Sequence, residues 1–594
     1  MIQFALRYAS WSQIDEVGLE RLRRKVDGMK EGEMARRPEQ LDFLEPAANE
    51  LSRPTPATPA DIRRVKALMR SVAIELRQHD NPALNAADRN WMETHPQSLW
   101  PLLDAAVAAS ATRKRDDALI TACQWLLANQ LELIRYRLER GHDWARVMLE
   151  VYQEKLIGLA RSNTLPEPDW FVLVNLLKDA KVPIRPEMME ALSRAIAEVT
   201  PGEAPELDDI GRELQGLVDQ MGASVGDDPF MVVEGLAETG TLMPADLRAY
   251  LTHELGLSRH SVLREALPLL LLDPEPMVRQ AAAAALEQVA TPETFSPVML
   301  RRTLLVRNWV PEIEREAIDR LVRKARVKGV ACAQWPPAAT LAIQCSAVDG
   351  SGAQSLILTT PGGRNGLFAG ILLKQGFGVR DAWCDLSVPR SKITRSLKEV
   401  RHEMQWISIG RDYLDLVVQH HIASGLAAGN LPLTAIVQIA EAIGATDWKD
   451  RGLNVAVETE RLFAGLGAEA NNKAAIDASL RRSNLLLAED PMMQSWFEDD
   501  AAIRELVSNR RRMRHDVAVR RVLDKMLTAR RGVWAERLLF LALWMQAGTA
   551  AAAPVEWARD CVVLAHELLT TCPLAELPAM VTIAERSVFV ARVG

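Results

Sequence analysis

The densest group of side chains that could bind a ligand lies between residues 504 and 531 and is basic. Spacing places several of these residues near one helical face, with Val507 and Val517 toward the other. Such a stripe can neutralise the phosphates of a nucleic acid, and a solvated helix face is the alternative interpretation. The candidate nucleic-acid-binding residues are Arg510, Arg511, Arg512, Arg514, Arg520, Arg521 and Lys525.

Basic residues also outnumber acidic ones across residues 301–401, although the whole chain carries a net charge of −7. Residues 201–230 are acidic, so the charge is segregated along the chain. The two basic segments, 301–401 and 504–531, could bind nucleic acid, or they could be solvated or pair with the acidic segment. The basic residues singled out in 301–401 are Arg301, Arg302, Arg323, Lys324, Arg326, Lys328, Arg390, Lys392, Arg395 and Lys398.

Residue types suited to catalysis occur near residues 335–410, without a recognised motif. Asp381, Asp385 and His402 are the candidates for an enzyme site there. Gly-rich segments at 349–352 and 360–366 each precede a strand pattern instead of a helix, which predicts hairpin turns and not phosphate-binding loops.

Metal and cofactor sites are not predicted. His420 and His421 project about 100° apart on a helix, so they cannot both bind one ion from its face, and a surface or interhelical pair is expected. The six Cys residues form no CxxC pair, which favours reduced thiols in a cytoplasmic protein. The sequence therefore favours a protein without catalytic activity.

The elements that position these residues are mostly helical. The chain has 594 residues, 48% of them hydrophobic, with aromatics at only 5%, and it is rich in Ala, Leu, Arg and Glu. These proportions exclude a disordered chain or a disulfide miniprotein and favour helices. The apolar stretch 538–555 contains Gln546, Gly548 and Pro554, which argues for a buried helix followed by a loop instead of a membrane span.

One segment has strand periodicity. Residues 340–348, 355–359, 367–374 and 379–386 predict four strands at hairpin spacing, followed by a helix after Pro389 and a fifth strand at 406–409. The fold class is therefore mainly α, with helical-repeat sections and one small α+β module. The predicted domains are an N-terminal helical segment (1–51), a Pro-rich linker (52–60), a helical domain (61–200), helical repeats (201–334), the α+β module (335–410) and a C-terminal helical domain (411–594).

A repeated pattern marks residues 258–328. Pro276, Val278, Ala282 and Leu286 recur 35 residues later as Pro311, Ile313, Ala317 and Leu321. The pattern resembles the second helix of a HEAT repeat, over about residues 244–328. In that family small Ala residues let paired helices approach closely, and an Arg at the position of Arg279 ties a turn to its neighbour. Glu314 stands where the second unit should carry that Arg.

The resemblance implies an α-solenoid, which typically exposes ridges and grooves that hold another macromolecule. The leading hypothesis is a non-enzymatic cytoplasmic scaffold or adaptor that binds another protein. The alternatives are a nucleic-acid-associated protein that uses the two basic segments, and an enzyme with a site at the α+β module.

Overall fold

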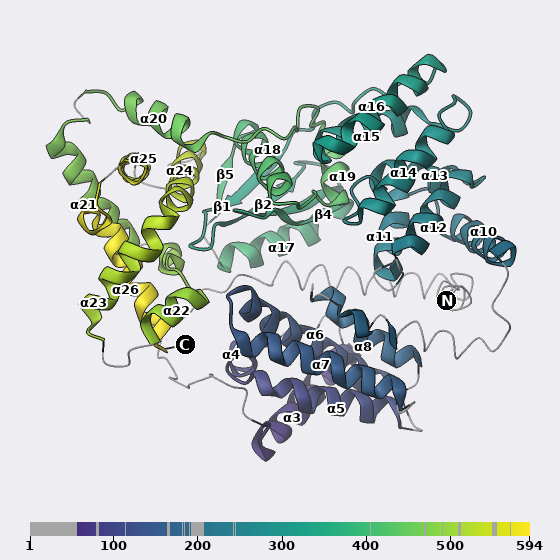
Figure 1. The fold of residues 1–594 in the computed structure, drawn as a ribbon, viewed down its shortest axis with the longest axis horizontal. Coiled ribbons are helices and arrows are strands. Elements are labelled where there is room, and N and C mark those ends of the chain that lie inside the picture. Colours follow the sequence, from purple (N-terminus) through teal and green to yellow (C-terminus); the bar gives the residue numbers. More distant parts are fainter. Residues whose placement is uncertain are drawn as a thin grey trace.

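A computed structural model describes residues 56–593, except for 79–81, 83, 113–114, 163–164, 166, 181, 183, 189, 192–206, 241–242, 244, 404–405, 469–470, 490, 509–512, 549–554 and 571. The chain is mainly helical with one small sheet, which confirms the predicted fold class at that level (Figure 1). The predicted segment 1–51 lies outside the described residues. Of the linker 52–60, residues 56–58 have no regular structure and the first described helix already begins at Pro59.

The first group of helices has a hydrophobic core of its own, which contains Leu126, Tyr152 and Trp170. The apolar spacing predicts helices near 61–79, 97–111, 115–139, 143–162, 168–180 and 186–199. The first five agree with the structure to within about two residues, most of the sixth lies outside the described residues, and α4 was not predicted. It is a short helix capped by Asn85, whose side chain accepts from the backbone N–H of Asp88 at 2.9 Å. The helices are α3 (Pro59–Gln78), α4 (Ala86–Thr94), α5 (Leu99–Ser110), α6 (Asp117–Glu139), α7 (Asp143–Arg161) and α8 (Glu167–Asp179).

The second group of helices stacks in two layers. One layer contains α11 (Pro229–Gly240), α13 (Ser261–Leu270) and α15 (Pro297–Val306). The other, which we call the α16 layer, contains α10 (Leu207–Ser224), α12 (Ala245–Leu257), α14 (Pro276–Gln288) and α16 (Glu312–Val327). From α12 to α16, each helix packs against the helix two positions before it in the chain (Figure 1).

Small residues allow this close stacking. Gly256 of α12 lies so near Ala285 of α14 that an added Cβ would stand 2.9 Å from the Ala285 Cβ. The sequence Asp273-Pro274-Glu275-Pro276 predicts a turn, and the structure has one between α13 and α14, with Pro276 as the first residue of α14. The resemblance to HEAT repeats themselves stays a prediction.

The sheet has the five strands that the alternation predicted, all paired antiparallel in the order β4-β3-β2-β1-β5. They are β1 (Ala342–Ser346), β2 (Ala353–Thr359), β3 (Asn365–Lys374), β4 (Gly378–Pro389) and β5 (Trp406–Ile409). The Gly-rich segments 349–352 and 360–366 join neighbouring antiparallel strands, so the prediction of hairpin turns is confirmed.

Helices lie against both faces of this sheet. On one face α17 (Arg390–Glu403) covers a small apolar cluster that includes Ile357, Phe368 and Ile393. Because side chains alternate along a strand, neighbouring Leu356 and Leu358 enter the large core on the other face. There α18 (Arg411–Ala427) contacts β3 and β4, and α19 (Thr434–Ile443) also contacts β4.

The C-terminal helices pack around α24 (Arg531–Ala547) and α25 (Val555–Leu569). A π-helical turn, Val522–Leu527, lies between α23 and α24. Within the described part of the chain, no helix is long and apolar enough to cross a membrane. The remaining helices are α20 (Val455–Gly465), α21 (Lys473–Glu489), α22 (Ala501–Ser508), α23 (His515–Arg521) and α26 (Pro578–Val593).

Candidate interaction surface and domain junction

The α16 layer carries large apolar side chains on its solvent-exposed surface. On α16, Ile313 is 89% exposed and Val327 is 85% exposed. Soluble proteins scatter single apolar residues over their surfaces, but exposed apolar groups concentrated on one region mark interaction sites. The exposed apolar residues of this layer are Tyr250, Leu257, Met277, Ile313 and Val327.

Ile313 is exposed although its counterpart in the repeat pattern is buried. The repeat pattern aligns it with Val278 of α14, which is buried in the structure. Helix α14 has a following helix of the layer, α16, packed against it. Helix α16 is itself the last helix of the layer. The same position is therefore covered in one helix and open to solvent in the other.

The departure from the repeat pattern at Glu314 also has a structural reason. Arg279 donates from Nε and Nη2 to the Glu314 carboxylate at 2.8 and 2.5 Å. Its Nη1 also donates to the carbonyl oxygens of Asp273 and Pro274. Arg279 thus ties its own turn to the neighbouring unit, and a Glu at position 314 supplies the acceptor.

The basic residues of 301–401 divide into buried and exposed groups. Arg301 and Arg302 are buried and form ion pairs with Glu441 of α19 at 2.7 and 3.0 Å. They join the stacked helices to the sheet-packed helices and are not available to a partner. The exposed cations near Val327 are Arg323, Lys324, Arg326 and Lys328.

The predicted stripe at 504–531 is not one continuous helix, because α22 ends at Ser508 and α23 begins at His515. The candidates Arg510, Arg511 and Arg512 lie outside the described residues. Arg514, Arg520 and Lys525 are exposed, and Arg521 is half-buried.

Basic residues at the two ends of this stripe contribute to the fold. Arg504 pairs with Asp499, and Arg530 pairs with Glu498 at 2.8 Å and also with Asp500. Arg531 donates to main-chain carbonyls at residues 568, 570 and 572. Part of the basic excess at 504–531 therefore serves intramolecular contacts.

The candidate enzyme residues of the α+β module are not assembled around a described cavity. Asp381 and Asp385 lie on β4, and the Asp381 carboxylate accepts from the N–H of Ala382 at 3.0 Å. His402 lies in α17, and its side chain is outside the described set. An enzyme site at these residues stays a prediction.

The turn between β1 and β2 contains a polar contact that the motifs did not indicate. The Asp349 carboxylate accepts from the N–H and hydroxyl of Ser351, and Lys374 donates to that hydroxyl at 2.5 Å. Burial lowers the pKa of Lys374. The backbone of Ser495 lies so close to Gly350 that a side chain there would collide with it, so the turn is packed against the C-terminal helices.

The histidine pair is interhelical, and both rings are buried instead of lying on the surface. His420 contacts Glu536 of α24 through Nε2 at 3.0 Å and accepts from the N–H of Leu453 at Nδ1. His421 Nδ1 donates to the carbonyl of Val417, and burial lowers the pKa of His421 to about 4, with His420 adding to the effect. Among the described residues, no group of three or more His, Cys, Asp or Glu residues could hold a metal ion.

A polar junction joins the α6–α7 turn to the rest of the molecule. Arg140 pairs with Asp499 at 2.9 Å, and Arg504 donates to the main-chain carbonyl of Arg140. Glu139 pairs with Arg380 of β4 at 2.5 Å. Sequence motifs could not reveal this junction, because Arg140 and Asp499 are 359 residues apart.

The comparisons with known proteins concern the regions just described. Residues 244–329 match a family described as the Y4lR second domain, and residues 456–592 match one described as the Y4lR C-terminal helical domain. The chain is also 23% identical over 485 residues to a protein named "Uncharacterized protein y4lR" from Sinorhizobium fredii (strain NBRC 101917 / NGR234). That alignment covers 81% of this chain and 90% of the relative. No solved structure matches the chain.

Proposed function

We propose that the protein is a non-enzymatic cytoplasmic scaffold that binds another protein through the α16 layer. The observation that carries the proposal is the exposure of Ile313 and Val327 on the last helix of that layer. Burying an apolar side chain on association is favourable by about 25 cal/mol per Å² of apolar surface. Two nearly fully exposed side chains on one helix can therefore contribute to binding when a partner covers them.

The charges around Val327 indicate the chemistry of the partner. Arg323, Lys324, Arg326 and Lys328 are all exposed, in the C-terminal part of α16 and directly after it. The one ion pair described for them, between Lys324 and Glu287, is long at 3.9 Å. The favoured partner is a protein segment with apolar residues for Ile313 and Val327 and acidic residues for these cations.

A capture experiment with matched variants tests this proposal. The full chain is immobilised and exposed to an extract of its source organism, and bound proteins are quantified by mass spectrometry. We expect Ile313→Asp/Val327→Asp to lose at least about 90% of one specific partner, because loss of a few kcal/mol of binding energy lowers affinity more than tenfold.

The control is Val457→Asp, which places the same charge at a side chain that is 65% exposed on α20. It should retain the partner. Equal capture by all three proteins, or equal loss in both variants, would contradict the proposal.

Nucleic-acid binding is the second candidate function, supported by the exposure of Arg514, Arg520 and Lys525. A gel shift with DNA and RNA at low and high salt tests it. Charge reversal of these three residues should weaken binding uniformly across sequences and flatten the salt dependence. Absence of any shift at low salt would eliminate this candidate.

A further inference from the structure

Helix α3 has a preformed surface at the lower edge of the molecule in Figure 1. One face of the helix belongs to the core of α3–α8, where Val65, Leu68 and Val72 are buried. Because this core already holds the helix in place, the opposite face keeps its shape without a partner. That face is exposed to solvent and carries both cations and isoleucines.

The exposed face of α3 has cations but no carboxylate. The helix contains two acidic residues, of which Asp61 is buried and Glu75 is half-buried. Arg63, Lys66 and Arg70 are exposed. Within the described chain, none of these three side chains forms an ion pair or a hydrogen bond. Their positive charges are therefore available to an external anion.

Helical spacing places the three cations in one row. At about 100° per residue, Arg63, Lys66 and Arg70 lie within about 60° of one another around the helix axis. Ile62 and Ile74, which are 39% and 52% exposed, lie on either side of this arc. These five residues, which we call the α3 ridge, extend along about 18 Å of helix.

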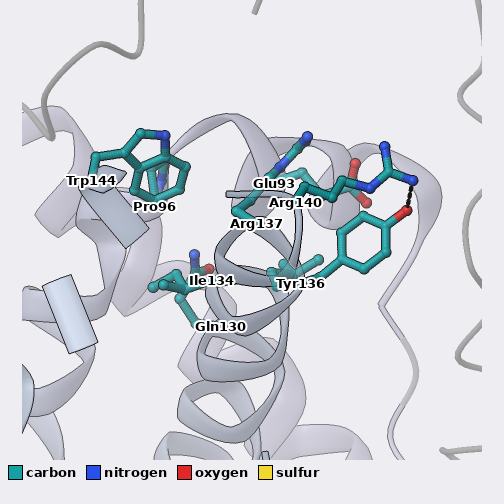
Figure 2. A pocket seen from close by; sticks show the side chains of 9 residues that line it. Glu93, Pro96, Gln130, Ile134, Tyr136, Arg137, Arg140 and Trp144 are labelled. Carbon is teal, nitrogen blue, oxygen red and sulfur yellow. Dashed lines mark hydrogen bonds between the residues drawn. The ribbon is translucent and has the colours of Figure 1, made fainter. Parts of the chain in front are cut away.

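Cations on the neighbouring helix α6 are paired within the fold instead. Arg135 pairs with Glu139 at 2.6 Å. Near the end of α6, Arg140 donates to the hydroxyl of Tyr136, as Figure 2 shows, and pairs with Asp499. A solvated helix face typically mixes charges of both signs. The α3 ridge has one sign only, which favours an anionic partner.

The isoleucines of the α3 ridge restrict the class of anionic partner. A nucleic acid and a lipid bilayer both present rows of phosphates to a set of cations. Aliphatic side chains are stabilised when they enter the boundary between lipid headgroups and acyl chains, whereas a phosphate backbone offers them no apolar contact. Single-stranded nucleic acid is usually held by aromatic side chains as well, and α3 contains none. The combination of cations and isoleucines therefore favours a bilayer.

We infer that the α3 ridge binds the surface of an anionic lipid bilayer. The three cations contact lipid phosphates, and Ile62 and Ile74 enter the headgroup region beside them. The contact is peripheral, so it requires no helix that crosses the membrane. The whole chain carries a net charge of −7, so the attraction is local to the ridge and is weakened by salt. The α16 layer belongs to the other unit, so this inference does not depend on the proposed protein partner.

Co-sedimentation of the full chain with lipid vesicles tests the inference. The probes are vesicles of phosphatidylcholine alone and vesicles in which phosphatidylglycerol replaces one third of that lipid. We expect the anionic vesicles to bind at least about tenfold more tightly, because each cation near an anionic surface contributes about fivefold in affinity. High salt should reduce this preference, because ions screen the charges.

Matched variants assign the contacts. One variant replaces the three cations of the ridge with glutamine, and its control replaces two arginines and one lysine that are exposed near α20 and α21. The substitutions are Arg63→Gln/Lys66→Gln/Arg70→Gln for the ridge and Arg451→Gln/Lys473→Gln/Arg481→Gln for the control. The ridge variant should bind anionic vesicles at least about tenfold more weakly than the control, although both lose the same charge.

A second variant tests the apolar contact. Ile62→Ser/Ile74→Ser keeps every charge of the ridge and should weaken binding to anionic vesicles several-fold. The relative loss should persist at high salt, because the apolar contact is not screened. Thermal unfolding of each variant separates loss of binding from loss of the fold.

The inference is overturned if the unmodified protein binds neither kind of vesicle or binds both equally. That comparison needs no variant, so it remains decisive even if a variant fails to fold. The inference is also overturned if the folded ridge variant binds as tightly as its control, or if the folded isoleucine variant binds as tightly as the unmodified protein. Binding of a DNA duplex through the same three cations, without binding to anionic vesicles, would assign the ridge to nucleic acid instead.

Discussion

The helices α3–α8 and the rest of the described chain differ in how they are held together. Helices α3–α8 enclose a separate core, whereas one continuous core extends from Val218 through the sheet to Val588. The two cores do not merge among the described residues, and ion pairs and hydrogen bonds at the α6–α7 turn join the two units. Continuous apolar packing makes neighbouring elements unfold together, while a polar interface permits units to separate.

The largest effect on stability is expected from the substitution Trp309→Ala in the continuous core. Trp309 is fully buried and donates from its indole to the carbonyl of Trp448 at 3.0 Å, joining the stacked helices to the sheet-packed helices. We expect a loss of about 3–5 kcal/mol in the free energy of unfolding, as is typical for a buried Trp. Hydrogen exchange should then accelerate from α10 through α26 while α3–α8 keep their protection.

Trp170→Ala is the corresponding substitution in the core of α3–α8. Trp170 is 2% exposed and donates to the carbonyl of Leu156 at 2.7 Å. Its loss should accelerate exchange in α3–α8 and leave the sheet protected. If both substitutions accelerate exchange over the whole chain, the two regions are one cooperative unit.

A second prediction concerns the buried ion pairs inside the continuous core. Glu441→Gln removes the negative charge that Arg301 and Arg302 share. It leaves the buried Arg301 guanidinium without a carboxylate and Arg302 with only Glu265, at 3.8 Å. Breaking a buried pair in this way costs about 3 kcal/mol. Chemical denaturation should show the loss, whereas Glu458→Gln, which breaks an exposed pair with Arg461, should leave the midpoint unchanged. Equal midpoints for both variants would contradict the structural role of Glu441.

A lower pH should reduce the stability of the continuous core, because His421 is buried there in its neutral form. Burial lowers the pKa of His421 to about 4 in the folded protein, against about 6.5 for an unfolded His. The unfolded state therefore takes up the proton first, and stability is lost as the pH falls from about 6.5 toward 4. The loss at pH 5 is about 2 kcal/mol. Urea titrations at pH 7 and pH 5 should show this loss in the free energy of unfolding, and the loss should be smaller in His421→Gln. An equal loss in both proteins would exclude His421 as the cause.

The smallest expected effect on stability is at the junction. Arg140→Gln removes the ion pair with Asp499, which also pairs with Arg504, so a charged partner remains for that carboxylate. We expect the free energy of unfolding of either unit to change by less than about 1 kcal/mol. Exchange at residues 139–142 and 499–504 should nevertheless accelerate, because the contact between the units is weakened.

The salt concentration provides a second test of the junction. Raising the salt concentration should accelerate exchange at the same residues in the unmodified protein, since ions screen charges at a partly exposed interface. Arg320→Gln breaks an exposed ion pair with Glu316 within α16 instead, away from the junction, and is the matched control. Unchanged exchange at 499–504 in Arg140→Gln would show that the junction does not depend on this ion pair.

Sequence patterns predicted most elements, because their signals are local. Alternation of apolar residues predicted all five strands, and the turn residues at 349–352 and 360–366 predicted the hairpins. The short helix α4 was missed because its nine residues contain few apolar positions.

Candidate binding residues were harder to assign than elements, because a sequence shows charge but not which charges are neutralised. The basic segments 301–401 and 504–531 contain both residues that are neutralised by ion pairs within the fold and residues that are exposed to solvent. Arg302 is buried against Glu441, and Arg530 pairs with Glu498, whereas Lys525 is exposed. Spacing alone could not separate a residue that binds a partner from one that stabilises the fold.

The sequence by itself determined most of the helices, the strand order along the chain and the hairpin turns, because hydrophobic periodicity and turn chemistry act over a few residues. Only the tertiary structure decided which core each element joins and which charges remain exposed. Arg140 meets Asp499, and Trp309 meets Trp448, across more than a hundred residues of chain. Contacts of this range depend on how whole elements pack, and packing is decided by the burial of all their apolar faces together.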